Sequence, residues 1–274
     1  MSAYTVTSSR EEQGIWQNRT GKDEAMENTE IKTQEILDVF ERYEIKYLLE
    51  EKQYQALRKQ LNGLVQVDQY GKTTITNIYF DTPDRRLIRT SLEKPVYKEK
   101  LRLRSYGIPG PDTTVFVELK KKYKGVVYKR RVDMPLAEAH RYLYDHCRRR
   151  FPSQIEKEIN WVQDFYKNLE PSMYIAYDRI ATFGVEDPGL RLTFDTNILW
   201  REDHLELTEQ PWGRPLLKPG QYLLEVKIGD GMPLWLSHIF DELKIYPTSF
   251  SKYGNAYLQS LTQGCGVKGE TCCA

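Results

Sequence analysis

The sequence has no apolar run that approaches the roughly 20 residues needed to cross a bilayer. Its first residues, MSAYTVTSSREEQGIW, lack the basic-then-apolar order of a secretory signal. We therefore expect a cytoplasmic protein without a transmembrane segment. Net charge is also small, with 40 lysines and arginines against 39 aspartates and glutamates. The whole-molecule charge thus gives no sign of nucleic-acid binding, and any anion site must come from local clustering.

The sequence also lacks a P-loop motif and a recognised cysteine-based site. No GxxxxGKS or GxxxxGKT motif occurs, which excludes a P-loop as the source of any phosphoryl chemistry. Of four cysteines, Cys265, Cys272 and Cys273 fall in the last ten residues, with no histidine close by and no recognised metal-binding spacing. We therefore predict a flexible tail over residues 261–274 rather than a metal or redox site.

The remaining chain is long enough for one large domain with appendages, at 274 residues in total. Residues 1–38 are polar, mixed in charge and without an apolar period, which predicts a disordered or loosely attached arm. The folded domain is accordingly predicted over residues 39–260.

Within this domain, alternation of apolar and polar residues predicts eight β-strands. They begin at Arg42, Ile75, Tyr97, Thr114, Val126, Met173, Leu190 and Tyr222. Helical patterns interrupt them over residues 51–63, 135–147, 153–169 and 233–243. Turn residues such as Gly125 favour antiparallel hairpins between neighbours. The predicted fold class is α+β.

One predicted strand, YKEKLRLRSYG, carries a row of four like charges. Its basic residues occupy every second position, with leucines between them: Lys98, Lys100, Arg102 and Arg104 against Leu101 and Leu103. Because side chains of a strand alternate between its two faces, the four cations line one face. Such a face is usually solvated, so its role must be inferred from the pattern of the other strands.

Six further strands repeat this design, with charge on one face and apolar residues on the other. Their charged face carries Arg42, Glu44 and Lys46; Glu118 and Lys120; Lys129, Arg131 and Asp133; Tyr177 and Arg179; Arg191, Thr193 and Asp195; and Glu225 and Lys227. An open sheet with a wet charged face fits this pattern. A closed antiparallel eight-stranded barrel fits it too, with helices packed outside and the cations lining a tunnel. We favour the barrel because basic residues occur on all seven strands.

A cation-lined tunnel is unfavourable when empty, since its like charges repel one another. A polyanion with evenly spaced charges relieves this repulsion, and arginine and lysine are the usual phosphate binders. The carboxylates Glu44, Glu118 and Glu225 can hold a divalent cation, Mn²⁺ or Mg²⁺, that bridges protein and phosphate oxygens. The residues therefore indicate phosphoryl chemistry on nucleotides or polyphosphate.

Eight short motifs resemble the polyphosphate polymerase (VTC) domain family of the triphosphate tunnel, or CYTH-like, superfamily. They occur in the family's order: YEIKYLL, ITNIYFDT, LRLRSYG, TVFVELK, YDRIATF, LRLTFDT, LLEVKI and FSKYG. The resemblance spans about residues 40–257 and implies a triphosphate tunnel fold. The triphosphatases of the superfamily begin with ExExK, whereas this chain has Arg42 at the first of these positions, which weakens the hydrolase interpretation.

The resemblance also implies roles for individual residues. Phosphate-binding catalytic positions are Lys46, Arg102, Arg104, Lys120, Lys129, Arg179 and Lys252. Further substrate-binding positions are Tyr177, Arg191 and Ser251, to which the charged face adds Arg42, Arg131 and Lys227. Glu225 falls on the metal-binding glutamate, and the charged face adds Glu44 and Glu118. For Lys98 and Lys100, two interpretations stay open: they line the tunnel entrance, or they face plain solvent. The lysines 121, 122 and 124 are interpreted as a solvated turn.

The predicted function is a metal-dependent polyphosphate polymerase that transfers the terminal phosphoryl of ATP onto phosphate or polyphosphate. Two alternatives stay open: a tunnel triphosphatase that hydrolyses NTP or inorganic triphosphate, and a non-catalytic polyphosphate or nucleotide binder. The expected partners are ATP and inorganic phosphate or polyphosphate, with no nucleic acid. Any membrane partner would be encoded separately, because no transmembrane segment is predicted.

Overall fold

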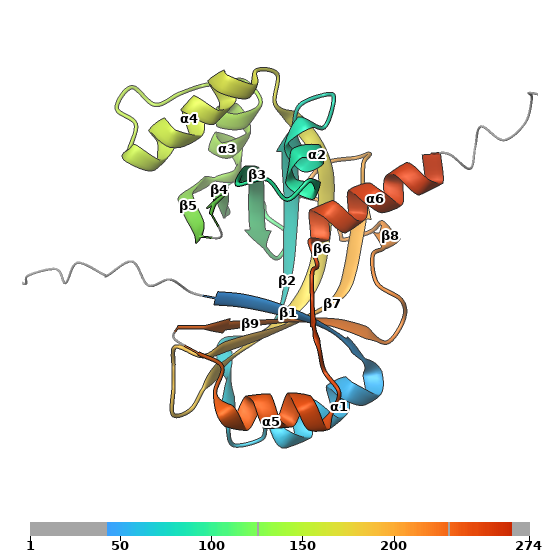
Figure 1. Ribbon diagram of the computed structural model, residues 1–274. Coiled ribbons are helices and arrows are strands. Elements are labelled where there is room, and N and C mark those ends of the chain that lie inside the picture. The colour runs from blue at the N-terminus through green and yellow to red at the C-terminus, as the bar shows by residue number, and fades with distance from the viewer. Residues whose placement is uncertain (1–42, 125, 230, 265–274) are drawn as a thin grey trace, which may run out of the picture. The chain divides into compact units, whose positions relative to one another are not determined.

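The computed structural model describes residues 43–264 except residues 125 and 230, and the described chain is α+β (Figure 1). Contacts divide the chain into residues 1–39 and 40–274, and all described residues belong to the second unit. Each of the eight predicted strands is present. They are β1 (Tyr43–Glu50), β2 (Val65–Asp81), β3 (Tyr97–Tyr106), β4 (Thr114–Tyr123), β5 (Val126–Pro135), β6 (Glu170–Gly184), β7 (Arg191–Arg201) and β9 (Gln221–Ile228).

Two short strands bring the sheet to ten. They are β8 (Arg214–Pro215), which pairs with β7, and β10 (Pro247–Thr248), which pairs with β1. All ladders between strands are antiparallel, in the order β10-β1-β9-β7-β6-β2-β3-β4-β5. No ladder in the described part of the chain joins β5 to β1 or β10. The sheet therefore differs from the predicted closed eight-stranded barrel, since hydrogen bonds do not close it.

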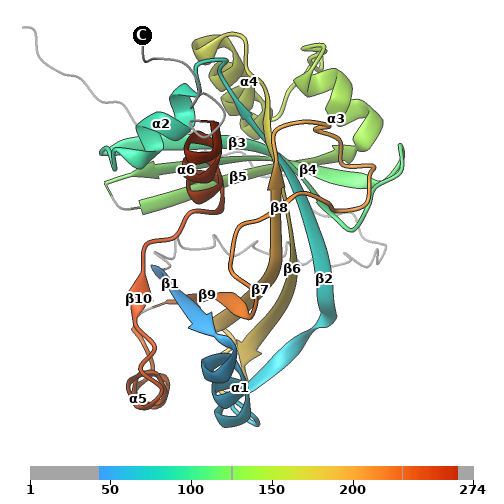
Figure 2. The ribbon, with the colours of Figure 1, turned by 90° about the vertical axis from the view of Figure 1, so that its right-hand side faces the viewer.

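The long strands β2, β6 and β7 connect two halves of this sheet. The β3 half contains β3, β4 and β5, and the β1 half contains β1, β9 and β10. Figure 2 shows β2, β6 and β7 running from one half to the other. The register between β2 and β6 shifts twice, between Val67 and Lys72 and between Tyr79 and Phe80. Such irregularities increase the bend of a strand pair, so the two halves turn their charged faces toward each other.

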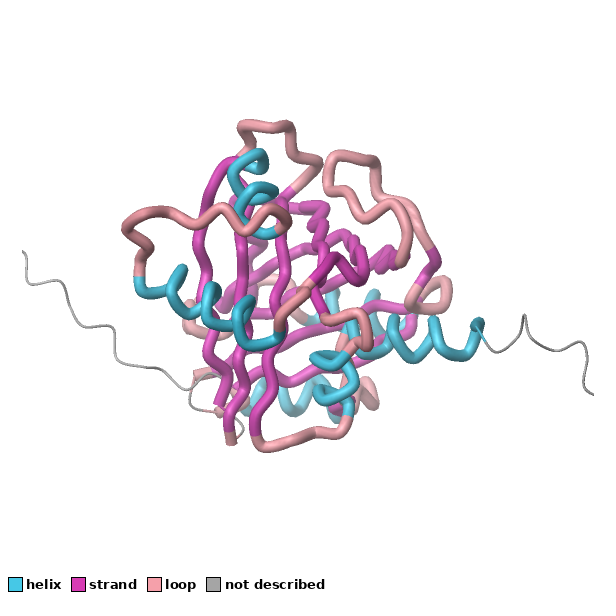
Figure 3. The backbone as a smooth tube through the Cα atoms, turned by 90° about the horizontal axis from the view of Figure 1, so that it is seen from above, coloured by secondary structure: helices cyan, strands magenta, loops and turns pink. Residues whose placement is uncertain are grey.

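In the part of the chain that the structure describes, six helices lie across and beside the strands (Figure 3). They are α1 (Glu51–Gln60), α2 (Arg86–Leu92), α3 (Leu136–Leu143), α4 (Gln154–Tyr166), α5 (Leu234–Glu242) and α6 (Lys252–Gly264). The four predicted helices are confirmed, and Ser153 caps α4 as expected by accepting a hydrogen bond from the Glu156 amide at 3.2 Å. No described helix is long and apolar enough to cross a membrane.

Three apolar clusters explain which faces the helices cover. Leu101, Leu103, Val115, Val117 and Leu119 of the β3 half pack beneath α3 and α4. Apolar residues of the β1 half pack beneath α1 and α5. A third cluster, with Ile75, Tyr79 and Ile175, lies on the same face as the charged residues and packs against α6. Part of the charged face is thus apolar and covered by a helix that the sequence patterns missed.

The buried carboxylate of Asp81 holds α6 against this face. One oxygen accepts from the Leu87 amide at 2.8 Å, and the other accepts from the Ile88 amide at 3.0 Å and from the Tyr253 hydroxyl at 2.8 Å. Asp81 therefore caps α2 and ties it to the first turn of α6. The Tyr253 ring also stacks on Tyr79, with ring centroids 4.6 Å apart.

Tyr253→Phe is expected to lower the free energy of unfolding by about 1.5–3 kcal/mol, the contribution of a hydrogen bond to a charged group. Urea denaturation followed by circular dichroism measures the change. Tyr257→Phe, also in α6, is the matched control, because no hydrogen bond of the Tyr257 hydroxyl is found among the described residues. Equal losses in the two variants would show that the Asp81 contact does not stabilise α6.

Candidate functional site

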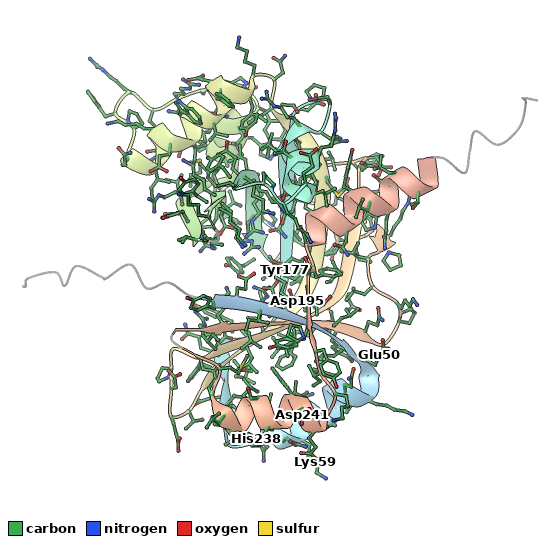
Figure 4. The ribbon with its side chains drawn as sticks, viewed as in Figure 1. Glu50, Lys59, Tyr177, Asp195, His238 and Asp241 are labelled. Carbon is green, nitrogen blue, oxygen red and sulfur yellow. The ribbon has the colours of Figure 1, made fainter. Side chains whose placement is uncertain are left out.

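Charged side chains from β1, β3, β4, β5, β6, β7 and β9 meet on the face where the two halves of the sheet approach each other. Tyr177 and Asp195, labelled in Figure 4, lie between the β3 half and the β1 half. Lys120 of β4 comes within 4.0 Å of Glu44 of β1, although five other strands separate β4 from β1 in the sheet. Side-chain contacts therefore bridge the two halves that backbone hydrogen bonds leave unjoined.

Glu118 is the centre of the cluster in the β3 half. Its carboxylate is only 1% exposed and accepts hydrogen bonds from Arg102 at 2.6 and 2.8 Å and from Arg131 at 2.7 Å. Lys129 lies 2.8 Å away, and Arg104 lies 3.8 Å away. Burial alone would raise the pKa of Glu118. The positive charges of Arg102, Arg104 and Lys129 outweigh burial and hold this pKa far below its ordinary value.

Arg104 is the most deeply buried cation of this cluster, with 5% of its surface exposed. Its Nε donates to the Asn77 side-chain oxygen at 2.8 Å, and one terminal nitrogen donates to the Tyr177 hydroxyl at 2.9 Å. These contacts fix the direction of the guanidinium from two neighbouring strands. Arg102 is held similarly, because it donates to the Tyr79 hydroxyl at 3.0 Å.

A second cluster surrounds Asp195 and Glu225. Arg179 donates to both oxygens of Asp195, at 2.6 and 2.7 Å, and to Glu225 at 3.0 Å. Lys252, the first residue of α6, contacts Asp195 at 2.5 Å and Glu225 at 3.1 Å, and Lys46 lies 3.5 Å from Glu225. Burial raises the pKa of Glu225, but the charges of Lys252, Lys46 and Arg179 hold it well below its ordinary value.

Glu44 lies between the two clusters and is less buried. Its oxygens are 3.4 Å from Lys46 and 4.0 Å from both Lys120 and Lys227. Burial raises the pKa of Glu44, yet Lys120 and the other lysines leave it below the ordinary value, while the negative charge of Glu225 opposes them. Glu44 and Glu225 also share Lys46, which lies 3.5 Å from Glu225.

A family model described as the VTC domain matches residues 41–261. The chain belongs to the VTC domain family. This result confirms the family predicted from the sequence motifs, over nearly the same residues. A search of curated proteins found no significant match.

Solved structures with similar folds share little sequence with this VTC domain. A protein of Bacillus halodurans provisionally described as an adenylate cyclase is 16% identical, with 77% of this chain and 95% of that chain covered and a TM-score of 0.49. An adenylyl cyclase-like protein of Hippeastrum, described as having a dominant triphosphatase activity, is 18% identical, with 77% and 92% covered and a TM-score of 0.48. A capping-enzyme triphosphatase of Mimivirus is 8% identical, with 73% and 87% covered and a TM-score of 0.30.

The predicted site residues of the VTC domain gather on this one face. Lys46, Arg102, Arg104, Lys120, Lys129, Arg131, Tyr177, Arg179, Lys227 and Lys252 all contact the two clusters or Glu44. Arg191, the first residue of β7, is exposed and lies opposite Lys227 in the ladder between β7 and β9. Arg42 lies outside the described residues.

Two inward residues were absent from the predicted site. Asp195 is fully buried and shares Arg179 and Lys252 with Glu225. Lys100, for which the sequence could not decide between the tunnel entrance and solvent, donates to the Ser251 hydroxyl at 3.0 Å. Strand alternation had already placed both on the charged face, and that was the available signal. Lys98 instead donates to the Ser91 carbonyl, and Lys121 pairs with Glu158 of α4.

Glu44 and Glu225 are the carboxylates we consider for a divalent ion, because both lie near Lys46, at 3.4 and 3.5 Å from its Nζ. The described residues contain no group of three or more His, Cys, Asp or Glu side chains able to surround a metal. Mg²⁺ is commonly bound by one or two carboxylates together with substrate phosphates and water, and the pair Glu44 and Glu225 matches that pattern. Glu118 is less accessible to such an ion, because its side chain is 1% exposed and Arg102, Lys129 and Arg131 approach its oxygens to 2.8 Å or less. The cations nearest to Glu225 lie at 3.0 and 3.1 Å.

Proposed function

We propose that this VTC domain protein is a divalent-metal-dependent polyphosphate polymerase, which transfers the terminal phosphoryl of ATP onto phosphate or polyphosphate. The observation that carries the proposal is the excess of positive charge between the two halves of the sheet. Among the described residues, ten basic side chains face four carboxylates there, so the carboxylates neutralise fewer than half of the basic groups. The basic residues are Lys46, Lys100, Arg102, Arg104, Lys120, Lys129, Arg131, Arg179, Lys227 and Lys252; the carboxylates are Glu44, Glu118, Asp195 and Glu225.

A polyphosphate chain compensates such an excess better than separate anions do, because it carries its charges in one flexible row. The guanidinium groups of Arg102 and Arg179 already bind carboxylates in the geometry that phosphate oxygens also accept. Phosphate groups near Glu118 and Glu225 would share these cations. The 4.0 Å contact between Lys120 and Glu44 brings the two halves of the sheet together across the charged face, as the wall of a tunnel requires.

Phosphoryl transfer needs positioning and charge neutralisation more than a covalent nucleophile. An oxygen of the acceptor phosphate forms a bond to the γ-phosphorus, and the bond from that phosphorus to the β–γ bridging oxygen breaks, so its electron pair leaves with ADP. Arg102, Arg104 and Arg179 are placed to hold phosphate oxygens in register during this exchange. A divalent ion held by Glu44 and Glu225 would supply additional neutralisation of the transferred group.

The function is tested by incubating the purified protein with ATP and Mn²⁺, then resolving the products on a gel beside a free-phosphate assay. We expect long chains from the wild type and from Lys121→Ala/Arg130→Ala, which alters only the outer-face partners of Glu158. Arg102→Ala should lose them. Free phosphate without chains would identify a triphosphatase instead, and neither product would identify a binding protein.

A further inference from the structure

Lys100 differs from the other nine basic residues that face the site. Each of those nine has a carboxylate oxygen within 4.0 Å. For Lys100 no such oxygen is found among the described residues, and the hydrogen-bond partner of its Nζ is the Ser251 hydroxyl at 3.0 Å. Lys100 is thus a partly buried amine without a counter-ion.

The charged groups that face Lys100 all disfavour a positive charge on its amine. Lys120 is directly opposite in the ladder between β3 and β4, Lys46 approaches from β1, and Lys98 and Arg102 flank it on β3. Burial contributes most, and with these four cations it lowers the pKa of Lys100 to about 7.

The N-terminal end of α6 completes the surroundings. Ser251 accepts from the Gly254 amide at 3.1 Å and so caps the helix whose positive end lies beside Lys100. The Tyr253 ring centroid lies 6.0 Å from Nζ. No group from α6 therefore supplies the missing negative charge, and the neutral hydroxyl of Ser251 accommodates either protonation state of the amine.

We propose that Lys100 is a further phosphate-binding residue of this site, one that takes up a proton when the terminal phosphate of a polyphosphate or triphosphate enters. The inference rests on the proposed function and adds a specific binding group to it. The free amine of Lys100 has a lone pair that accepts a proton from the phosphate hydroxyl or from solvent. An O–H bond breaks, an N–H bond forms, and the result is an ammonium group beside a fully ionised phosphate oxygen.

Binding and protonation are then linked, with a definite sign. The bound anion replaces repulsion by attraction, so the pKa of Lys100 is higher in the complex than the value of about 7 in the free protein. Above pH 7 the binding-competent, protonated fraction of the free protein falls, and the apparent affinity falls in proportion. Between pH 7 and 8 the protonated fraction falls from about one half to about one tenth, which predicts roughly fivefold weaker binding from this group.

Lys100→Arg tests the inference because arginine is always charged at these pH values. Binding of inorganic triphosphate without metal is measured by titration calorimetry at pH 8, in two buffers with different ionisation enthalpies, which gives the number of protons taken up. Uptake by Lys100→Arg should be smaller than that of the wild type by about 0.9 proton. Between pH 7 and 8 the variant should also lack the roughly fivefold loss of affinity. The ligand's own ionisation is common to both proteins and cancels in the comparison.

Lys98→Arg is the matched control, from the same row of β3, and should retain the wild-type proton uptake. Equal uptake by the wild type and Lys100→Arg, with tight triphosphate binding in both, would overturn the role of Lys100 and leave the proposed function standing. Absence of triphosphate binding by the wild type would overturn both. Thermal melting confirms that each variant is folded, and Lys100→Met, which cannot take up a proton, provides the second comparison if arginine does not fit.

Discussion

Glu118→Gln is expected to lower the free energy of unfolding by about 3–5 kcal/mol, the usual cost of removing one partner from a buried ion cluster. The Glu118 carboxylate is 1% exposed and compensates Arg102, Lys129 and Arg131 at once. A neutral amide leaves these cations close together without their shared counter-ion. Urea denaturation at pH 7 and low salt, with and without triphosphate, measures the effect.

Glu158→Gln is the matched control, because Glu158 also has two basic partners but lies on the outer face. It is 3.2 Å from Lys121 and 3.3 Å from Arg130, and 22% of its side chain is exposed. Exposed ion pairs contribute about 1 kcal/mol or less, so this variant should be nearly as stable as the wild type. Triphosphate should stabilise Glu118→Gln more than the wild type, since it replaces the missing anion. Equal losses in the two variants would contradict a central role for Glu118.

The same carboxylate predicts how stability depends on pH. The pKa of Glu118 in the folded protein lies far below its ordinary value of 4.5, because the surrounding cations outweigh burial. A lowered folded-state pKa contributes stability that is present above the unfolded-state pKa and is lost as the pH falls through the folded-state value. The difference in stability between the wild type and Glu118→Gln should therefore be constant above about pH 5 and shrink at lower pH.

Strand alternation was enough to predict most of the fold. It depends only on local sequence, so all eight long strands and the charged face were found, and periodic helices such as α4 were found with them. The helix α2 has only seven residues and follows Arg85, which adopts a left-handed conformation, while α6 contains Gly254 in its first turn. Both are stabilised by contacts with Asp81 rather than by local pattern, and those contacts are invisible in the sequence.

Alternation also cannot determine what lies across from a charged side chain. It placed Glu118 and Glu225 on the same face. Only the structure shows that Glu118 is surrounded by the cations of its own half, while Glu225 shares Lys46 with Glu44. Nor could it decide whether the ends of the sheet meet, because closure depends on the bend of β2 and β6. Asp195 was left out for the same reason: its partner Arg179 becomes apparent only from the register between β6 and β7.

Glu225→Gln is expected to reduce polyphosphate formation by about 100-fold or more, because it removes one of the two carboxylates proposed to hold the metal ion. Binding of triphosphate without metal should be retained or become tighter, since Lys46, Arg179 and Lys252 lose a competing anion. The rate of chain formation with ATP and Mn²⁺ and the Kd of triphosphate in chelator are the two measurements.

Asp195→Asn distinguishes a metal-binding role of Glu225 from a role in neutralising cations only. Asp195 shares Arg179 and Lys252 with Glu225, so its substitution also releases these cations, but it leaves the pair of Glu44 and Glu225 unchanged. If Glu225 acts through a metal, only Glu225→Gln should lose turnover beyond what its stability explains, and higher Mn²⁺ concentrations should partly restore it. If Glu225 serves only to neutralise cations, the two variants should lose turnover equally and Mn²⁺ should have no differential effect. In that case the metal must be held through the phosphates or through Glu44 alone.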